Sequence, residues 1–408
     1  MSPPSSLPSS LDLSNPEVRN DPYRYYATVR DSNPVLRTPT GAWLLTRYHD
    51  VQDVLRDPRF SSDAANLNRR NRRGRRPDRG SIMRQDATTT VLLFRDPPDH
   101  TRIRSLVNQA FTPRRVEQLE SQVQATVTDL LDQVAARGGT FDLLADFGFP
   151  LPVRVICDLL GVPFEDQEQF REWSPPMARL LDGNLGLNDM VDGLAASARL
   201  IQYFNKLYDA RRAEPQDDLL TALVNAEEEG EKLSGAELRV TTTFLFVAGF
   251  ETTANLIGNG MLALLRNPEQ LELLRSDPSL AKNAIEELLR FDSPIHVTVR
   301  IPTERVEISG TAIPPGESVV CALGAANRDP EVFADPDRLD ITRANANRHL
   351  AFSQGGHYCL GAALARSEGA AAFSQLVQRF PRLRLVTDEP EYRETQVVRG
   401  LRELLLSH

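Results

Sequence analysis

The spacing of apolar residues divides the chain into a long helical region and a shorter region with strands. Between residues 99 and 288, apolar positions recur with the spacing of amphipathic helices. Strand-like segments return only after residue 294, at 295–300 and 318–323. Prolines predict helix boundaries inside the first region, at Pro150, Pro152, Pro163, Pro175, Pro176 and Pro215. The pattern therefore predicts a mostly α protein with small β-sheets.

Shorter elements are predicted ahead of the helical region. They are a helix over 21–30, a hairpin over 35–37 and 42–46, and a helix over 48–56. Residues 1–20 are polar and rich in proline, so they are predicted to be disordered. No internal repeat and no linker-like composition follows residue 20. Residues 21–408 are therefore expected to form a single domain.

The longest predicted helix begins at Ser234, which forms a capping box with Glu237. Leu233 and Leu238 occupy the positions of a hydrophobic staple around that cap. Apolar character then continues to Leu265, which gives a helix of roughly thirty residues and about 45 Å. Such a helix is long enough to cross a whole domain.

The centre of this helix contains residues that form helices poorly, including Gly249, Glu251 and Thr252. The Thr252 hydroxyl can donate to the carbonyl of Ala248, four residues back, which bends a helix and opens its hydrogen bonding. Gly249 removes side-chain bulk from the same turn. Without further context, this pattern is typical of a kink in a core helix.

Composition and charge exclude several classes of protein. Of the 408 residues, 41% are hydrophobic and 25% are charged, as in globular proteins, and the net charge of −9 disfavours a general nucleic-acid binder. The three cysteines lie far apart, which offers no disulfide framework and suits the reducing cytoplasm. The N-terminus has no apolar signal segment, and no uninterrupted apolar run reaches about 18 residues, so no membrane association is expected.

One cysteine has a distinctive setting. Cys359 is at the end of a glycine-rich loop, and the residues after it have the apolar spacing of a helix. Its sulfur is therefore expected at a helix N-terminus, where the thiolate is favoured. Glycines on both sides allow a flat ligand to approach the backbone. A thiolate in this position suits one axial site of haem iron. Cys157 and Cys321 are interpreted as buried small hydrophobes.

The residues around Cys359 resemble the haem-binding signature of the cytochrome P450 superfamily, Phe-x-x-Gly-x-His-x-Cys-x-Gly. Phe352, Gly355, His357, Cys359 and Gly361 meet its fixed positions. The resemblance is to the soluble bacterial class, and it covers residues from about 20 to 406. It implies the single-domain P450 fold, with haem b (iron protoporphyrin IX) between the long central helix and the helix that follows Cys359, the metal ligand.

The central motif of the long helix is similar to the oxygen-activation motif of that family, Ala-Gly-x-Glu/Asp-Thr. The resemblance implies that Ala248 and Gly249 lie against the haem, that Thr252 steadies dioxygen and its water, and that Glu251 relays protons. Phe250 stands where bacterial relatives often have His, but the position carries no chemistry.

Charged residues elsewhere in the chain match two further sets of family positions. His100, Arg104, Arg300 and His357 match the residues that bind the haem propionates in this family. Glu287 and Arg290 resemble the Glu-x-x-Arg pair of the family, for which Arg338 would be the third partner. That trio is interpreted as a structural network that fixes the loop leading to Cys359.

The substrate pocket is predicted to be apolar. Its candidate residues are Leu92, Leu93, Phe244, Val247, Ile295, Val297 and Val398. Such a pocket admits macrolides, terpenoids, steroids or fatty acids alike. His296 and Arg399 are interpreted as structural or exposed residues, with orientation of a polar end of the substrate as the alternative. The arginine-rich segment 69–79 is most simply a solvated loop, with an acidic substrate, carrier protein or electron donor as its alternative partner.

The resemblance implies a cytoplasmic, monomeric monooxygenase. It would insert one atom of O2 into a hydrophobic small molecule, by C–H hydroxylation or epoxidation. The chain shows no usable dinucleotide motif and no cysteine cluster, because Gly258 and Gly260 lie within the predicted helix. Electrons from NAD(P)H would therefore arrive through a reductase and a ferredoxin or flavodoxin. The alternatives are a peroxide-driven peroxygenase and a haem-binding gas sensor.

Overall fold

The computed structural model describes residues 15–68, 91–110, 113–180, 186–228, 231–395 and 397–408. Its α-helices are α1 Pro16–Asn20, α2 Pro22–Ser32, α3 Tyr48–Arg56, α5 Asp99–Ala110, α6 Pro113–Arg137, α7 Pro150–Leu160, α8 Gln167–Arg179, α9 Leu187–Ala213, α10 Leu219–Asn225, α11 Gly235–Arg266, α12 Pro268–Ser276, α13 Ala281–Phe291, α14 Leu323–Ala326 and α15 Ala362–Arg379. Its strands are β1 Val35–Arg37, β2 Trp43–Leu45, β3 Phe60–Ser61, β4 Thr140–Asp142, β5 Glu227–Glu228, β6 Glu231–Lys232, β7 Val297–Pro302, β8 Val306–Ile308, β9 Thr311–Ile313, β10 Val319–Ala322, β11 Arg384–Leu385 and β12 Leu405–Ser407.

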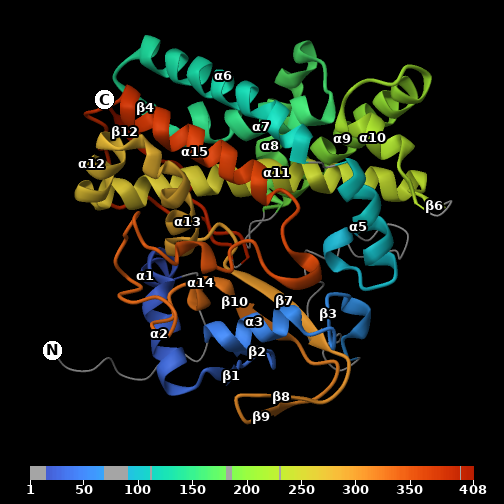
Figure 1. Cartoon of the computed structure of the whole chain (residues 1–408), viewed down its shortest axis with the longest axis vertical. Coiled ribbons are helices and arrows are strands. Elements are labelled where there is room, and N and C mark those ends of the chain that lie inside the picture. Colours follow the sequence, from blue (N-terminus) through green and yellow to red (C-terminus); the bar gives the residue numbers. More distant parts are fainter. Residues whose placement is uncertain (1–14, 69–90, 111–112, 181–185, 229–230, 396) are drawn as a thin grey trace.

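Helix α11 is the central element of the helical part. Helices α6, α7 and α15 lie on one side of it, and the main sheet with α2 and α3 lies toward the other end of the molecule (Figure 1). The predicted capping box is present, since Ser234 and Glu237 each bond to the backbone of the other. The predicted long helix is confirmed, with 32 residues.

The main sheet has five strands in the order β1-β2-β10-β7-β3. The predicted hairpin is its edge, with β1 antiparallel to β2, while β10 runs parallel to β2 and antiparallel to β7. Val319 therefore lies between Trp43 and Arg300 across three neighbouring strands. This register places Arg300, a predicted cofactor residue, on β7 beside the central strand β10.

Two predicted features of the chain are wrong. Residues 16–20 form helix α1 rather than disorder; Arg19 within it is buried and bonds to Glu394 at 3.1 Å. The earlier residues of the predicted disordered segment lie outside the described part. Pro175 and Pro176 lie inside α8 rather than at its boundary. The boundaries at Pro150 and Pro215 are confirmed, since α7 begins at the first and α9 ends just before the second.

Within the described ranges, α11 is the one helix that is long and apolar enough to cross a membrane. Of its most apolar window, 61% is buried inside the fold. Two of its glycines explain how neighbouring elements pack so closely on it. A Cβ on Gly258 would lie 2.8 Å from Leu144, and one on Gly260 would lie 2.5 Å from Phe373. These glycines therefore serve helix packing, and both lie within α11, as the rejection of a dinucleotide motif assumed.

Candidate active site

The loop that carries Cys359 is held by its backbone. Gly355 has φ +68°, and a Cβ there would lie 2.5 Å from the carbonyl oxygen of Leu55 on α3, so this position requires glycine. The Cys359 amide donates to the carbonyl of Phe352 at 2.9 Å. Helix α15 begins three residues after Cys359, with Gly361 as its N-cap. The predicted position of the sulfur at a helix N-terminus is confirmed.

The environment of the Cys359 thiol differs from that of the other cysteines. Cys157 and Cys321 are fully buried, as predicted, whereas Cys359 keeps exposed surface. Burial nevertheless raises the pKa of the Cys359 thiol, while the Gly361 amide and the cations of Arg104 and Arg366 act to lower it. A metal cation bound there would add the charge that favours the thiolate.

Four predicted cofactor residues gather beside this loop. The rings of His100 and His357 lie 4.2 Å apart, and His357 Nε2 is 3.0 Å from Ser62 Oγ. Burial, with the positive charges of Arg300, His100 and Arg104, lowers the pKa of His357 to about 3. The structure therefore brings together His100, Arg104, Arg300 and His357, the residues that were predicted to bind the haem propionates.

This basic cluster fits a ligand with carboxylates. His100 Nε2 is buried and has no hydrogen-bond partner among the described residues. Arg104 donates to the Tyr358 carbonyl at 2.8 Å, and Arg300 donates to the Val299 carbonyl at 3.0 Å. Neither arginine forms an ion pair with a carboxylate in the described part of the chain. Two propionates would supply the missing acceptors and negative charge.

One face of α11 stays accessible although most of the helix is buried. Phe244, Ala248 and Thr252, four residues apart along the helix, are partly buried, whereas Phe250 and Glu251 are buried. The Thr252 hydroxyl donates to the Ala248 carbonyl at 2.8 Å, as predicted. This face is therefore suited to border a ligand site, with a hydroxyl at its centre.

Glu251 has an interaction partner outside α11, Arg393, which the sequence pattern did not reveal. Its Oε1 accepts hydrogen bonds from Arg393 and, at 3.1 Å, from Asn255. The Glu251 side chain is only 1% exposed. Asn255 lies four residues along the same helix and was foreseeable. Arg393 is 142 residues away in the sequence, so no local pattern could identify it.

The predicted structural network exists with one different member. Arg290 binds Glu287 through two bonds of 2.7 and 2.8 Å, and both side chains are fully buried. The third charged partner is Arg343, whose Nε lies 3.1 Å from Glu287 Oε2. The prediction of Arg338 is wrong, because Arg338 contributes only its carbonyl, which accepts from both other arginines. Glu287 therefore shares its one negative charge between the two arginines, whose other donors bind backbone carbonyls.

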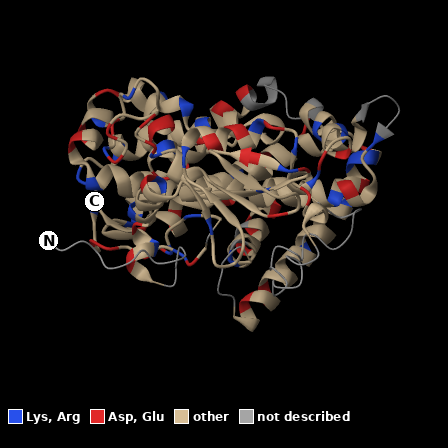
Figure 2. Cartoon of the chain, turned by 90° about the horizontal axis from the view of Figure 1, so that it is seen from below, with Lys and Arg blue, Asp and Glu red and all other residues tan. Residues whose placement is uncertain are grey.

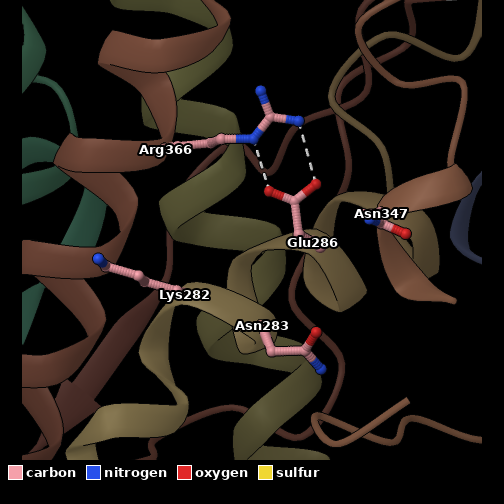
Figure 3. Close-up of a pocket in the computed structure, with 5 residues that line it drawn as sticks. All are labelled: Lys282, Asn283, Glu286, Asn347 and Arg366. Carbon is pink, nitrogen blue, oxygen red and sulfur yellow. Dashed lines mark hydrogen bonds and ion pairs between the residues drawn. The ribbon is translucent and has the colours of Figure 1, made fainter. Parts of the chain in front are cut away.

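A second ion pair, between Glu286 and Arg366, joins α13 to α15 beside the cysteine loop, and Figure 3 shows the two side chains. Arg366 Nε lies 2.5 Å from Glu286 Oε1, and the Arg366 guanidinium covers the Phe352 ring at 4.6 Å. Burial alone would raise the pKa of Glu286, but bonds from His349 and Arg366 bring it down to about 2. Arg366 also donates to the exposed Tyr358 hydroxyl at 3.2 Å. These contacts fasten the loop from the outside.

A surface depression lies around this pair. Its volume is about 440 Å³, and it is lined by Lys282, Asn283, Glu286, Asn347 and Arg366 (Figure 3). The lining is polar and includes two basic side chains, so it differs from the apolar pocket predicted for the substrate. The depression instead offers a place for a partner to contact the outer side of the cysteine loop.

The predicted pocket residues lie in several parts of the fold. Ile295 and Val398 pair in an isolated antiparallel bridge, and Leu92 and Val247 are buried in the same apolar cluster. Val297 packs instead with the tyrosines of α2, and Leu93 is 38% exposed. Their contact with a substrate stays a prediction.

Two further residues have the structural role that was expected of them. Arg399 Nε lies 2.7 Å from Asp292, and His296 is buried beside the same carboxylate at 3.6 Å.

The arginine-rich segment 69–79 lies outside the described residues. Elsewhere, basic and acidic residues are intermixed along the described chain (Figure 2).

Comparison with known proteins decides the family. The model of the family described as cytochrome P450 matches residues 43–281 and 274–404. The chain belongs to the cytochrome P450 family. Cytochrome P450 107B1 of Saccharopolyspora erythraea is 44% identical over 406 residues, which is 94% of each protein. The cytochrome P450 monooxygenase PikC of Streptomyces venezuelae is 40% identical, over 97% of this chain and 94% of PikC.

The P450 fold is confirmed as well. A crystal structure of P450BioI in complex with an acyl carrier protein that bears hexadec-9Z-enoic acid has a TM-score of 0.86 and 36% identity. It covers 97% of this chain and 99% of that one. The protein is therefore a P450 monooxygenase, an oxidoreductase whose family uses haem iron and O2. The predicted family, fold class and enzyme class are confirmed.

Proposed function

We propose that this P450 inserts one atom of O2 into a C–H bond or double bond of a hydrophobic small molecule. The observation that carries the proposal is the joint presence of Cys359, a basic carboxylate-binding cluster, and the Glu251–Thr252 pair on α11. Haem iron, when bound, supplies the oxygen-activating chemistry. Cys359 would hold the iron, and His100, Arg104, Arg300 and His357 would hold the propionates.

The protein's own residues have separate tasks in this proposal. Thr252 presents a hydroxyl on the accessible face of α11, where it can accept and pass on a proton. Glu251, its buried neighbour, supplies the proton that the hydroxyl passes on. The apolar side chains of Phe244 and Val247 would orient the substrate and exclude water.

Electrons would come from NAD(P)H through a reductase and a ferredoxin or flavodoxin. The support is a polar depression with Lys282 and Arg366 in its lining, next to the exposed ring of Tyr358. Tyr358 adjoins Cys359, so a small acidic donor on this surface would come close to the sulfur. The cytoplasm, where buried thiols such as Cys157 stay reduced, suits such partners.

The substrate class rests on the apolar candidates and on relatives. P450BioI is in complex with a carrier protein that bears a long acyl chain, and the apolar pocket proposed for this chain would accept an acyl chain or a fused-ring compound. We therefore propose macrolides, steroids, terpenoids or acyl chains as substrates to screen first. Binding would be followed by the shift of the haem absorption band.

The proposed function predicts dependence on electron donors. With a bound substrate, the holoenzyme should form oxygenated product with ferredoxin, reductase and NADPH, in proportion to the nucleotide oxidised. Product analysis by mass spectrometry with labelled O2 would measure this. Higher turnover with hydrogen peroxide alone would instead indicate a peroxygenase. Absence of any product, with ligand binding retained, would indicate a sensor or carrier.

A further inference from the structure

The two oxygens of Glu251 lie in different environments. Oε1 accepts from Arg393 and from the Asn255 amide, and Arg393 also donates to Asn255 Oδ1 at 3.0 Å. The three side chains thus form a closed triangle. Oε2, in contrast, is buried and has no hydrogen-bond partner among the described residues. One oxygen of the carboxylate is anchored and the other is left available.

Burial makes this anchoring necessary. The side chain of Glu251 is 1% exposed and that of Arg393 is 10% exposed. An ionised carboxylate at such a position is costly unless a cation and hydrogen-bond donors accompany it. Arg393 supplies the cation, and Asn255 supplies a further donor to the same oxygen.

The segment that carries Arg393 is fastened to α11. The Arg393 amide donates to the Gly400 carbonyl at 2.9 Å, next to the bridge between Tyr392 and Leu401. A Cβ on Gly400 would overlap the Asn255 side chain, so glycine lets the segment approach the helix without displacing that side chain. One turn further along α11, Asn259 donates to the Arg399 carbonyl at 3.1 Å. The segment that carries the guanidinium is therefore held by one backbone–backbone bond and by one bond from a side chain of α11.

We propose that Arg393 is a positioning residue for proton delivery, which anchors Glu251 through Oε1 so that Oε2 carries the proton. The inference rests on the proposed relay by Glu251 and Thr252. The carboxylate takes up a proton from water at Oε2 and later passes it to the Thr252 hydroxyl, which releases its own proton toward the ligand site, so each proton has a source and a destination. Throughout, Oε1 stays bonded to Arg393, which keeps the carboxyl from turning away.

The test compares Arg393→Gln with the conservative Arg393→Lys. In the ferredoxin-driven reaction, we expect Arg393→Gln to lower kcat about tenfold and to enlarge the solvent deuterium isotope effect on kcat. Arg393→Lys should recover most of both. Substrate affinity and the carbon-monoxide spectrum should stay at the parental values. A parental kcat and isotope effect in Arg393→Gln would overturn the relay role.

A matched control tests whether the loss of any buried ion pair would change kcat and the isotope effect in the same way as Arg393→Gln. Arg211→Gln removes the largely buried pair with Asp218, in which Arg211 Nε lies 2.5 Å from the carboxylate, between α9 and the start of α10. We expect it to lower stability and to leave the isotope effect unchanged. An isotope effect that changes equally in both variants would contradict a specific role for Arg393.

A second readout does not depend on turnover. Thermal unfolding of the parent, Glu251→Gln, Arg393→Gln and the double variant forms a double-mutant cycle. We expect the double variant to unfold at a higher temperature than the sum of the single changes predicts. Additive changes would overturn the ion pair itself. If the parent forms product only with peroxide while the cycle shows coupling, the proposed function fails and the anchoring of Glu251 still stands.

Discussion

Replacement of Glu287 by Gln is expected to destabilise the protein by about 3–5 kcal/mol and to prevent stable haem incorporation. Among the residues that the structure describes, Glu287 is the one carboxylate paired with both Arg290 and Arg343, and all three side chains are almost completely buried. Without its negative charge, two guanidinium groups would stay in the interior uncompensated. Burial already lowers the pKa of Arg290, which shows how unfavourable its charge is at this position. Denaturant unfolding and the ratio of haem to protein would measure both effects.

Two further variants make this test specific to the observed network. Arg343→Gln should behave like the Glu287 variant, because it removes a side chain that binds the carboxylate directly. Arg338→Gln should change stability little, since only the Arg338 carbonyl takes part. A folded, haem-loaded Glu287→Gln protein of parental stability would contradict the account of this network.

Replacement of Thr252 by Ala should lower product formation by at least about tenfold while nucleotide oxidation continues. The substitution removes the hydroxyl on the accessible face of α11 next to Glu251, so the proton relay loses its last member. Electrons that no longer lead to product should appear as hydrogen peroxide. Product, peroxide and NADPH would be measured in the same reaction.

Thr252→Ser is the matched control, since it keeps the hydroxyl and its bond to the Ala248 carbonyl within reach. It should retain most of the parental product yield per NADPH. If the product yield per NADPH of Thr252→Ala equals that of the parent, the hydroxyl has no part in proton delivery. The relay through Glu251 would then lose its support as well.

Features determined by short-range interactions could be predicted from the sequence. The capping box joins residues three positions apart, and the bond from Thr252 to Ala248 spans one helical turn. The position of Cys359 ahead of a helix likewise depends on its immediate neighbours. In each case the interaction partners are a few residues apart, so spacing alone determines whether they can meet.

Features that depend on distant contacts could not be predicted in the same way. Arg343 rather than Arg338 faces Glu287 because of how the intervening loop turns, and both arginines are equally plausible from their spacing. Arg393 reaches Glu251 only because the C-terminal segment packs on α11. Helix α1 is ordered by its contact with Glu394, near the other end of the chain, despite its polar composition.

The carbon-monoxide difference spectrum of the reduced protein tests the central claim, that Cys359 binds haem iron as a thiolate, most directly. The parent should give the thiolate-type spectrum, and Cys359→Ser should lose it completely, even if some haem remains bound. A Cys359→Ser protein that still gives the thiolate-type spectrum would contradict the assignment of the metal ligand and of the site built around it.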